Sequence, residues 1–247
     1  MPGRMSARAF CPGHVTGLFV IKDEDKEPER KGSIGSGICL SRGAMSMVNL
    51  SVGTEDFKVF LNGVEDEAPV TRAAIDYLMG GSGMDVTVRT SLELPVGQGL
   101  GMSGAGALST CLAICRIMGL PEEEAVAAAH VAEVTNGTGL GDVVAQAKGG
   151  LEIRRKPGLE PPGKIDNVSI NSRVYLCVME GEISTASVLK NKEKRDSINK
   201  AGNKWFAKVD KLTLPVVLDA SYNFALESGL MSDDEKELCK ELWDAGH

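Results

Sequence analysis

A glycine-rich loop is the part of this sequence best suited to chemistry. Residues 95–107 contain five glycines, Gly97, Gly99, Gly101, Gly104 and Gly106. The alternating apolar segment 86–94 before the loop predicts a strand, and the Ala- and Leu-rich segment after it predicts a helix. Glycine lets the backbone approach a phosphate closely, and the N–H groups of a helix N-terminus attract negative charge. The spacing therefore predicts a phosphate-binding loop.

Two common phosphate-binding motifs fit this loop poorly. A Walker A loop needs Gly-Lys-Ser/Thr at its end, and Met102-Ser103-Gly104 contains no lysine. The glycines at 99, 101 and 104 satisfy the dinucleotide fingerprint, but that fingerprint also expects a strand ending in an acid about 20 residues later. A helix start at Pro121 follows instead, so the dinucleotide interpretation is weak.

Two acidic residues follow the loop in an order that suits phosphoryl transfer. Glu133 lies on a predicted helix that ends near Asn136-Gly137, and Asp142 follows in a glycine-rich turn. Phosphoryl transfer requires a hard cation on oxygen ligands, a positioned base and donors around the transferred group. Each acid alone could be structural, but their order behind the glycine loop favours the chemical interpretation.

The loop resembles the Pro-x-x-x-Gly-Leu-Gly-Ser-Ser-Ala motif of the GHMP small-molecule kinases, and residues 128–150 resemble the acidic region of that family. The resemblance implies that Ser103, Glu133 and Asp142 are catalytic. Ser103 and Glu133 would hold Mg²⁺, and Asp142 would take the proton from the substrate hydroxyl. The ATP-binding residues implied by the resemblance are Pro95, Gly97, Gly99, Leu100, Gly101, Met102, Ser103, Gly104 and Ala105.

The segments 10–19, 32–37 and 181–185 are similar to the archaeal pantoate kinase branch of this family, with His14 at the place of a common lysine. The resemblance covers about residues 9–189. It implies ATP- and Mg²⁺-dependent phosphorylation of (R)-pantoate to 4-phosphopantoate, a step in coenzyme A biosynthesis. Archaeal-type shikimate kinase, homoserine kinase, a non-catalytic nucleotide-binding relative and a truncated fragment stay open as alternatives.

Pantoate carries a carboxylate, and the planar fork of an arginine binds a carboxylate bidentately. Because alternate side chains of a strand face opposite ways, one of Arg154 and Arg155 should face the cleft, and we expect it to be Arg154. A surface arginine pair is the structural alternative. His130 precedes Glu133 by three positions on one helix face, and Ser33 lies in a glycine-rich loop expected at 32–37. The predicted substrate-binding residues are Ser33, His130, Arg154, Thr185 and His14.

The composition suits a metabolic enzyme. A net charge of −7 with only 4% aromatic residues argues against a nucleic-acid surface. No apolar run reaches signal-peptide or membrane-spanning length. The six scattered cysteines form no C-x-x-C zinc pair, so buried thiols in a reducing cytoplasm are expected. We expect a cytoplasmic protein whose partners are pantoate and ATP, without nucleic acid or membrane, and with a homodimer left open.

Alternating and helical patterns along the chain predict an α+β fold. Strands are expected over 9–21, 37–50, 56–61, 85–93, 150–154, 164–169 and 174–179. Helices are expected over 70–79, 105–118, 121–135, 198–209, 215–227 and 233–245, the last with a capping box from Ser232 to Glu235. By resemblance, residues 1–170 form a ribosomal-S5-domain-2-like ATP-binding lobe and 171–247 a ferredoxin-like lobe. That second lobe is expected to be incomplete, because family members continue with a third glycine-containing motif.

Overall fold

The computed structural model describes residues 5–178 and 191–245. A seven-stranded sheet has the order β4-β3-β5-β2-β6-β7, and β1 pairs with β2 beside this path. All pairs are antiparallel except β3 with β5. The strands are β1 (Met5–Lys22), β2 (Gly32–Val52), β3 (Phe57–Leu61), β4 (Val64–Glu65), β5 (Met84–Leu92), β6 (Leu151–Lys156) and β7 (Lys164–Val168). The predicted mixture of strands and helices is confirmed.

β1 and β2 form a long antiparallel ribbon whose register shifts between Pro12 and His14 and again between Thr16 and Leu18. Such irregularities re-aim side chains and are common beside active sites. The loop predicted at 32–37 is wrong, because these residues belong to β2. Their glycines allow close approach instead of a turn, since a Cβ at Gly37 would collide with the His14 ring.

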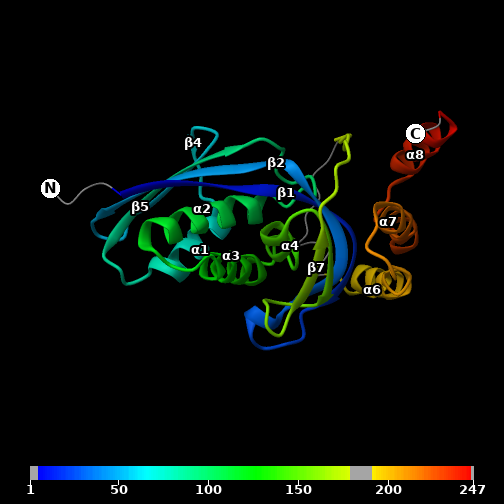
Figure 1. Ribbon diagram of the computed structural model, residues 1–247, viewed down its shortest axis with the longest axis horizontal. Helices are drawn as coiled ribbons and strands as arrows, with labels where there is room; N and C mark the ends of the chain where they lie inside the picture. The colour runs from blue at the N-terminus through cyan, green and yellow to red at the C-terminus, as the bar shows by residue number, and fades with distance from the viewer. Residues whose placement is uncertain (1–4, 179–190, 246–247) are drawn as a thin grey trace.

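Helices cover one face of this sheet, as Figure 1 shows. They are α1 (Pro69–Met79), α2 (Met102–Met118), α3 (Glu122–Asn136) and the short α4 (Asp142–Lys148), with a 3-10 turn, η1, at Pro28–Arg30. The sequence predicted the first three but placed a turn where α4 begins. Gly137 ends α3 in the left-handed conformation, with φ of 67°, as predicted.

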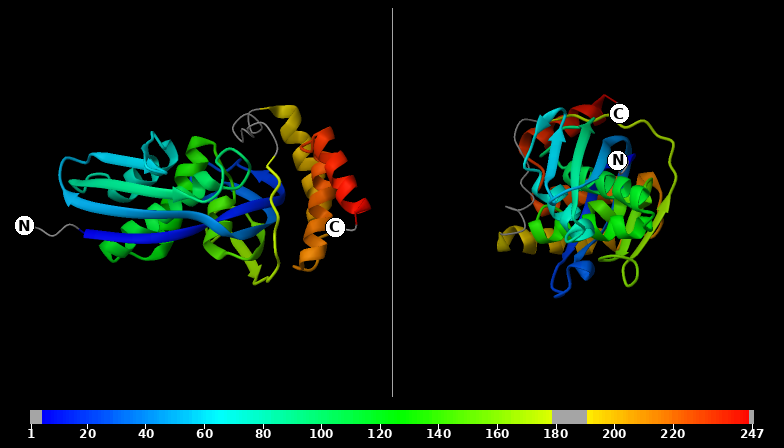
Figure 2. Two further views of the ribbon diagram at one scale, coloured as in Figure 1. Left: turned by 90° about the horizontal axis from the view of Figure 1, so that it is seen from above. Right: turned by 90° about the vertical axis from the view of Figure 1, so that its left-hand side faces the viewer.

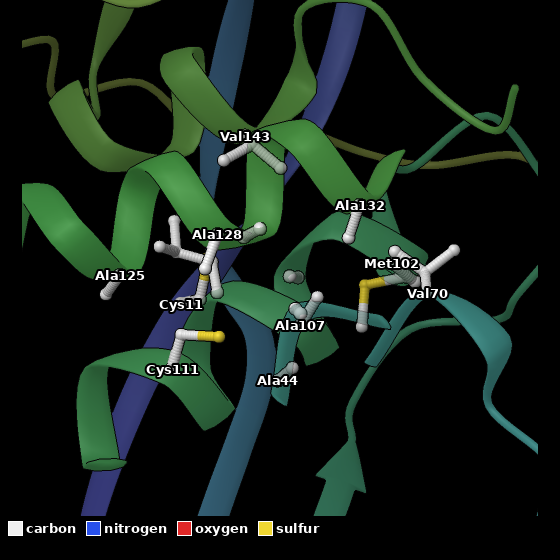
Figure 3. Close-up of a cluster of buried hydrophobic side chains, with 14 of the residues drawn as sticks. Cys11, Ala44, Val70, Met102, Ala107, Cys111, Ala125, Ala128, Ala132 and Val143 are labelled. Carbon is white, nitrogen blue, oxygen red and sulfur yellow. The ribbon is translucent and has the colours of Figure 1, made fainter. Parts of the chain in front are cut away.

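The core beneath these helices depends on small side chains. Four alanines of α3 are buried against α2, namely Ala125, Ala128, Ala129 and Ala132. Figure 3 shows three of them beside Cys11, Cys111 and Val143. Small side chains let helices approach closely, and interiors are packed to the density of organic crystals. The positions of α2 and α3 relative to β1 are therefore tightly fixed.

The three C-terminal helices lie together at one end of the sheet, as the left view of Figure 2 shows. They are α6 (Lys192–Phe206), α7 (Leu214–Ser228) and α8 (Asp233–Asp244). Leu18 of β1 and Ile153 of β6 form a buried cluster with Ile198, Trp205 and Phe224 of these helices. The predicted capping box of α8 is confirmed, because Ser232 and Glu235 bond each other's backbone N–H.

The strand predicted at 174–179 is wrong over its described part. Residues 171–178 have no ladder partner, and Tyr175 is 81% exposed. The β-branched and apolar pattern suits a strand, but a strand also needs a neighbour to receive its backbone hydrogen bonds. Instead this segment borders an open apolar groove of about 670 Å³ against Leu214, Leu218 and Leu242. The domain boundary at 170/171 stays a prediction.

None of the helices within residues 5–178 and 191–245 has the length and apolar character needed to cross a membrane.

Candidate active site

The glycine loop between β5 and α2 has a conformation that requires glycine. Gly97, Gly99 and Gly101 have φ values of 78°, 68° and 61°, which L side chains rarely adopt. The loop is fastened on two sides. The Leu100 carbonyl accepts a bond of 3.0 Å from the His14 N–H, and the Gly101 carbonyl accepts one of 2.8 Å from Nε2 of Gln146. The glycine loop is therefore held in place by β1 and α4.

The N-terminus of α2 has no side-chain cap, so the N–H groups of its first turn remain for a ligand or water. Met102, the first helical residue, is only 4% exposed. Its side chain joins the buried cluster beside Val70, as Figure 3 shows. Met102 therefore anchors the helix through its side chain, and only its backbone could contact a phosphate. The combination of positive-φ glycines and an uncapped helix end suits an anion.

Glu133, near the end of α3, presents its carboxylate to this loop. A Cβ at Gly104 would lie 3.0 Å from Oε2, and one at Gly139 would collide with the same atom. Oε2 is buried and has no hydrogen-bond partner among the described residues. Burial and the nearby charge of Asp142 raise the pKa of Glu133 to about 8, although hydrogen bonds from Thr138 and Ser103 oppose the shift. A cation at this carboxylate would remove the cost of burying it.

The donors around Glu133 fit a magnesium ion. The Glu133 carboxylate and the Ser103 hydroxyl are hard oxygen ligands that lie together. Within the part of the chain that the structure describes, no group of three or more His, Cys, Asp or Glu residues could form an all-protein metal cage. Mg²⁺ usually keeps several waters and binds one or two carboxylates together with substrate phosphates. The small donor set and the adjacent phosphate-binding loop therefore suit Mg²⁺.

Asp142 begins α4 directly opposite β1. Its Oδ1 lies 2.7 Å from Nδ1 of His14 and accepts a bond of 3.2 Å from the Thr16 hydroxyl. Burial would raise the pKa of Asp142, but His14, the positive charge of Arg154 and Thr16 together lower it. The side chain is 24% exposed. Asp142 is thus an ionised carboxylate with access to the site.

On its other side, His14 contacts a buried ion pair formed by Glu152 and Arg154. Its Nε2 lies 3.1 Å from Oε1 of Glu152, and the same oxygen accepts a bond from Nη1 of Arg154. His14 and Glu152 are fully buried, and Arg154 is 1% exposed. Glu152 was not among the site residues predicted from the sequence. An available signal was its spacing from Arg154, since positions two apart on a strand share a face, and the apolar Leu151 and Ile153 occupy the alternate positions.

Arg154 faces inward and Arg155 faces outward, as the alternation of β6 predicted. Arg155 pairs with Asp166 at the surface. Nε and Nη2 of Arg154 are buried without a partner among the described residues. Near them is the Ser33 hydroxyl of β2, since a Cβ at Gly141 would lie 2.7 Å from Nε of Arg154 and 2.5 Å from Oγ of Ser33. The free edge of this guanidinium and a hydroxyl therefore meet beside the residue that precedes Asp142.

The other predicted substrate contacts are placed differently. His130 is 1% exposed, and its Nε2 lies 3.1 Å from the Lys31 carbonyl. Burial lowers the pKa of His130. Both ring nitrogens of His14 face carboxylates. Thr185 lies outside the described residues. The structure thus brings Ser33 and Arg154 together near Asp142, while the substrate contacts of the two histidines and Thr185 stay predictions.

Comparison with known proteins identifies the family. The family model described as GHMP kinases N terminal domain matches residues 69–150. A pantoate kinase of Methanocaldococcus jannaschii is 33% identical over 237 residues, which cover 94% of this chain and 84% of that protein. The chain belongs to the GHMP kinases. A pantoate kinase of Thermococcus kodakarensis is 34% identical over 245 residues, covering 96% of this chain and 81% of that protein.

Solved structures agree with membership in the GHMP kinases. A protein described as a phosphotransferase related to the CoA biosynthesis pathway superposes with a TM-score of 0.82 at 29% identity, over 97% of this chain and 81% of that one. A homoserine kinase from Cytophaga hutchinsonii has a TM-score of 0.62 at 14% identity, covering 100% and 81% of the two chains, and supports the fold alone.

The GHMP kinase match covers only one half of the site. It contains the loop and both acids, Glu133 and Asp142. His14, Ser33 and Arg154 lie outside it, on β1, β2 and β6. The half of the site that contains the glycine loop is thus contiguous in sequence, whereas the half around Ser33 and Arg154 is assembled from distant strands.

Proposed function

We propose that this GHMP kinase transfers the terminal phosphoryl group of ATP to the primary hydroxyl of (R)-pantoate, giving 4-phosphopantoate for coenzyme A synthesis. The observation that carries this proposal is the similarity to two pantoate kinases, at 33% and 34% identity over 94% and 96% of the chain. The arrangement of Ser103, Glu133, Asp142 and Arg154 supports it, because these residues could supply metal ligands, a base and a group that binds a carboxylate.

The loop and the first turn of α2 would bind the phosphates of ATP through backbone N–H groups. Ser103 and Glu133 would hold Mg²⁺, which when bound neutralises charge on the phosphates. The buried Oε2 of Glu133 supports this assignment, since a bound cation would stabilise a carboxylate oxygen that has no donor among the described residues. Gly104 and Gly139 leave room for the carboxylate to face the loop.

Asp142 would accept the proton of the attacking hydroxyl. His14 and Thr16 both bond Oδ1, so Oδ2 would be the oxygen that faces the substrate. The hydroxyl oxygen forms the new bond to phosphorus, its proton moves to Oδ2, and ADP leaves. A carboxylate is a weak base, but the loose transition state of phosphoryl transfer needs little deprotonation until the bond to the leaving group is largely broken.

Arg154 and Ser33 would bind the carboxylate of the substrate. The unpartnered Nε and Nη2 of Arg154 form one edge of the guanidinium fork, which matches the two oxygens of a carboxylate. Ser33 adds a hydroxyl at the same place. A hydroxy acid bound here would lie next to the start of α4, where Asp142 could accept the proton of its hydroxyl group.

A coupled assay of ADP release tests this proposal with (R)-pantoate, shikimate, homoserine and mevalonate as acceptors. We expect kcat/KM for pantoate to exceed the others by at least about 10²-fold, because a site built for one pattern of polar groups rejects a poorly matching substrate. A preference for shikimate or homoserine would assign the chain to another GHMP kinase activity. ADP release without any acceptor preference would contradict a pantoate site.

A further inference from the structure

We propose that Glu152 is a positioning residue for Asp142 and acts through His14, a role that rests on the proposed function. Glu152 bonds the far side of the His14 ring, and the near side of that ring bonds Asp142. The three residues come from β6, β1 and α4. Glu152 thereby holds the imidazole as a cation that donates to both carboxylates and fixes Oδ1 of Asp142.

The geometry of the ring determines its protonation. An ionised carboxylate can only accept hydrogen bonds. Nδ1 lies 2.7 Å from Asp142 Oδ1 and Nε2 lies 3.1 Å from Glu152 Oε1, so both nitrogens must carry a proton if both bonds are to form. A neutral ring would leave one lone pair facing a carboxylate oxygen. Burial lowers the pKa of His14, but the two carboxylates outweigh this effect and raise it above its usual value.

The other charges around His14 are consistent with a cation. Arg154, on the same strand as Glu152, neutralises the second carboxylate. The Cys39 thiol of β2 is opposite His14 in the β1–β2 register, and burial followed by the charge of Glu152 raises its pKa to about 12, so it stays neutral. Glu133 lies near Asp142, whose charge acts on it. The buried chain therefore alternates in sign, from Asp142 through His14 and Glu152 to Arg154.

The buried imidazole ring of His14 has little room to rotate. A Cβ at Gly37 would collide with Nε2 of His14, so the strand opposite already touches the ring. His14 is fully buried, and its own backbone N–H is bonded to the glycine loop. Rotation of the imidazole would break both carboxylate bonds inside the protein. Loss of Glu152 alone removes one of the two bonds that set this orientation.

If this cluster of buried charges were purely structural, its desolvation cost would offset most of its contribution to the free energy of unfolding. Oε2 of Glu152 and two nitrogens of Arg154 are buried without partners among the described residues. Replacement of buried ion pairs by apolar side chains often leaves a protein as stable or more stable. We therefore interpret these charges as setting the orientation and charge state of His14, which contacts Asp142.

Nitrogen-15 NMR of the His14 ring in the folded 247-residue chain tests the charge state of the ring without an activity assay. The chain contains three histidines, His14, His130 and His247, so His130→Gln and His247→Gln variants assign the signals. At a pH above the usual pKa of histidine, we expect both ring nitrogens of His14 still to be protonated, because each faces a carboxylate oxygen. A His14 ring with only one protonated nitrogen at this pH would overturn the proposal.

Glu152→Gln tests the positioning role. The amide keeps the shape of the side chain and an oxygen for Nε2, but it removes the charge that stabilises the imidazolium. We expect kcat to fall about 10- to 100-fold, with the KM for ATP little changed, because a misplaced base slows the chemical step. The His14 pKa falls in this variant because one of the two carboxylates that raise it is lost, so the alkaline limb of kcat should move to lower pH. An unchanged pH profile would overturn the proposal.

Ile153→Val is the matched control, since Ile153 is the buried neighbour of Glu152 on β6 and faces the apolar cluster. It should lower Tm by roughly 2–4 °C and leave the alkaline limb in place. If Glu152→Gln does not fold, the His14 spectrum of the unaltered protein decides. Failure of the unaltered protein to phosphorylate pantoate would refute the proposed function, whereas equal pH profiles in an active enzyme would refute only the role of Glu152.

Discussion

Nδ1 of His14 and Oδ1 of Asp142 lie 2.7 Å apart although the two residues are 128 positions apart in the chain. This contact joins the irregular part of β1 to the first residue of α4. The loop that precedes α2 is bonded to the same two elements, through the backbone of His14 and the side chain of Gln146. The expected base and the glycine loop are therefore held by the same two elements, β1 and α4.

Replacement of Asp142 by asparagine should remove the base and keep the shape. The amide can still accept from Thr16, but it cannot take a proton, so kcat should fall by roughly 10²–10⁴-fold with the KM for ATP little changed. Asp166→Asn is the control, because Asp166 pairs with Arg155 at the surface. Turnover of Asp142→Asn close to that of the unaltered enzyme would exclude Asp142 as the base.

Gly139→Ala should disturb the metal site without touching a ligand. A Cβ at Gly139 would collide with Oε2 of Glu133, so the carboxylate must move. We expect the Mg²⁺ concentration for half-maximal activity to rise, in the same direction as for Glu133→Gln and Ser103→Ala.

Gly106→Ala is the control for the added methyl group. Its Cβ would meet only Thr71 Oγ1, at 3.8 Å, and it lies inside α2. It should stabilise the fold by about 0.5–1 kcal/mol, because alanine favours a helix interior over glycine. A Gly139→Ala enzyme with the Mg²⁺ response of Gly106→Ala would show that the Glu133 carboxylate does not bind the metal.

The stability of the metal-free protein should fall as pH rises. Glu133 has an ordinary pKa near 4.5 and a folded-state pKa of about 8, so between these values the folded state binds more protons than the unfolded state. The free energy of unfolding then decreases with increasing pH. The raised pKa of His14 acts in the same direction. We expect Tm to fall between pH 6 and 9, and Glu133→Gln to reduce but not abolish the slope. Identical slopes in thermal melts would contradict this environment of Glu133.

Arg154→Met should impair the binding of the acceptor far more than that of ATP. A carboxylate left without its bidentate partner in a buried site costs several kcal/mol, so the KM for pantoate should rise by at least about 10²-fold. Arg155→Met should have a small effect, because its side chain is 40% exposed and forms a surface ion pair with Asp166. Equal effects of the two variants on the KM for pantoate would place the carboxylate elsewhere.

Local patterns predicted most elements of this fold, whereas long-range pairing decided the rest. The loop and α2 could be predicted because the glycines and the helix are adjacent in sequence. The glycines at 32–37 were misread as a loop because they allow close packing inside β2, where Gly37 makes room for the ring of His14 on another strand. Glu152 was missed because its partner His14 lies 138 positions away. The segment 174–178 has the composition of a strand but no described neighbour to pair with.

The most direct test is identification of the product when the enzyme is incubated with ATP, Mg²⁺ and (R)-pantoate. Phosphorus-31 NMR and mass spectrometry should show one phosphomonoester on the primary hydroxyl, formed in equal amount to ADP. Asp142→Asn should give the same product at a greatly reduced rate. Release of inorganic phosphate in place of a phosphorylated acid, or the absence of ADP with a folded protein, would contradict the assignment of this site to phosphoryl transfer onto pantoate.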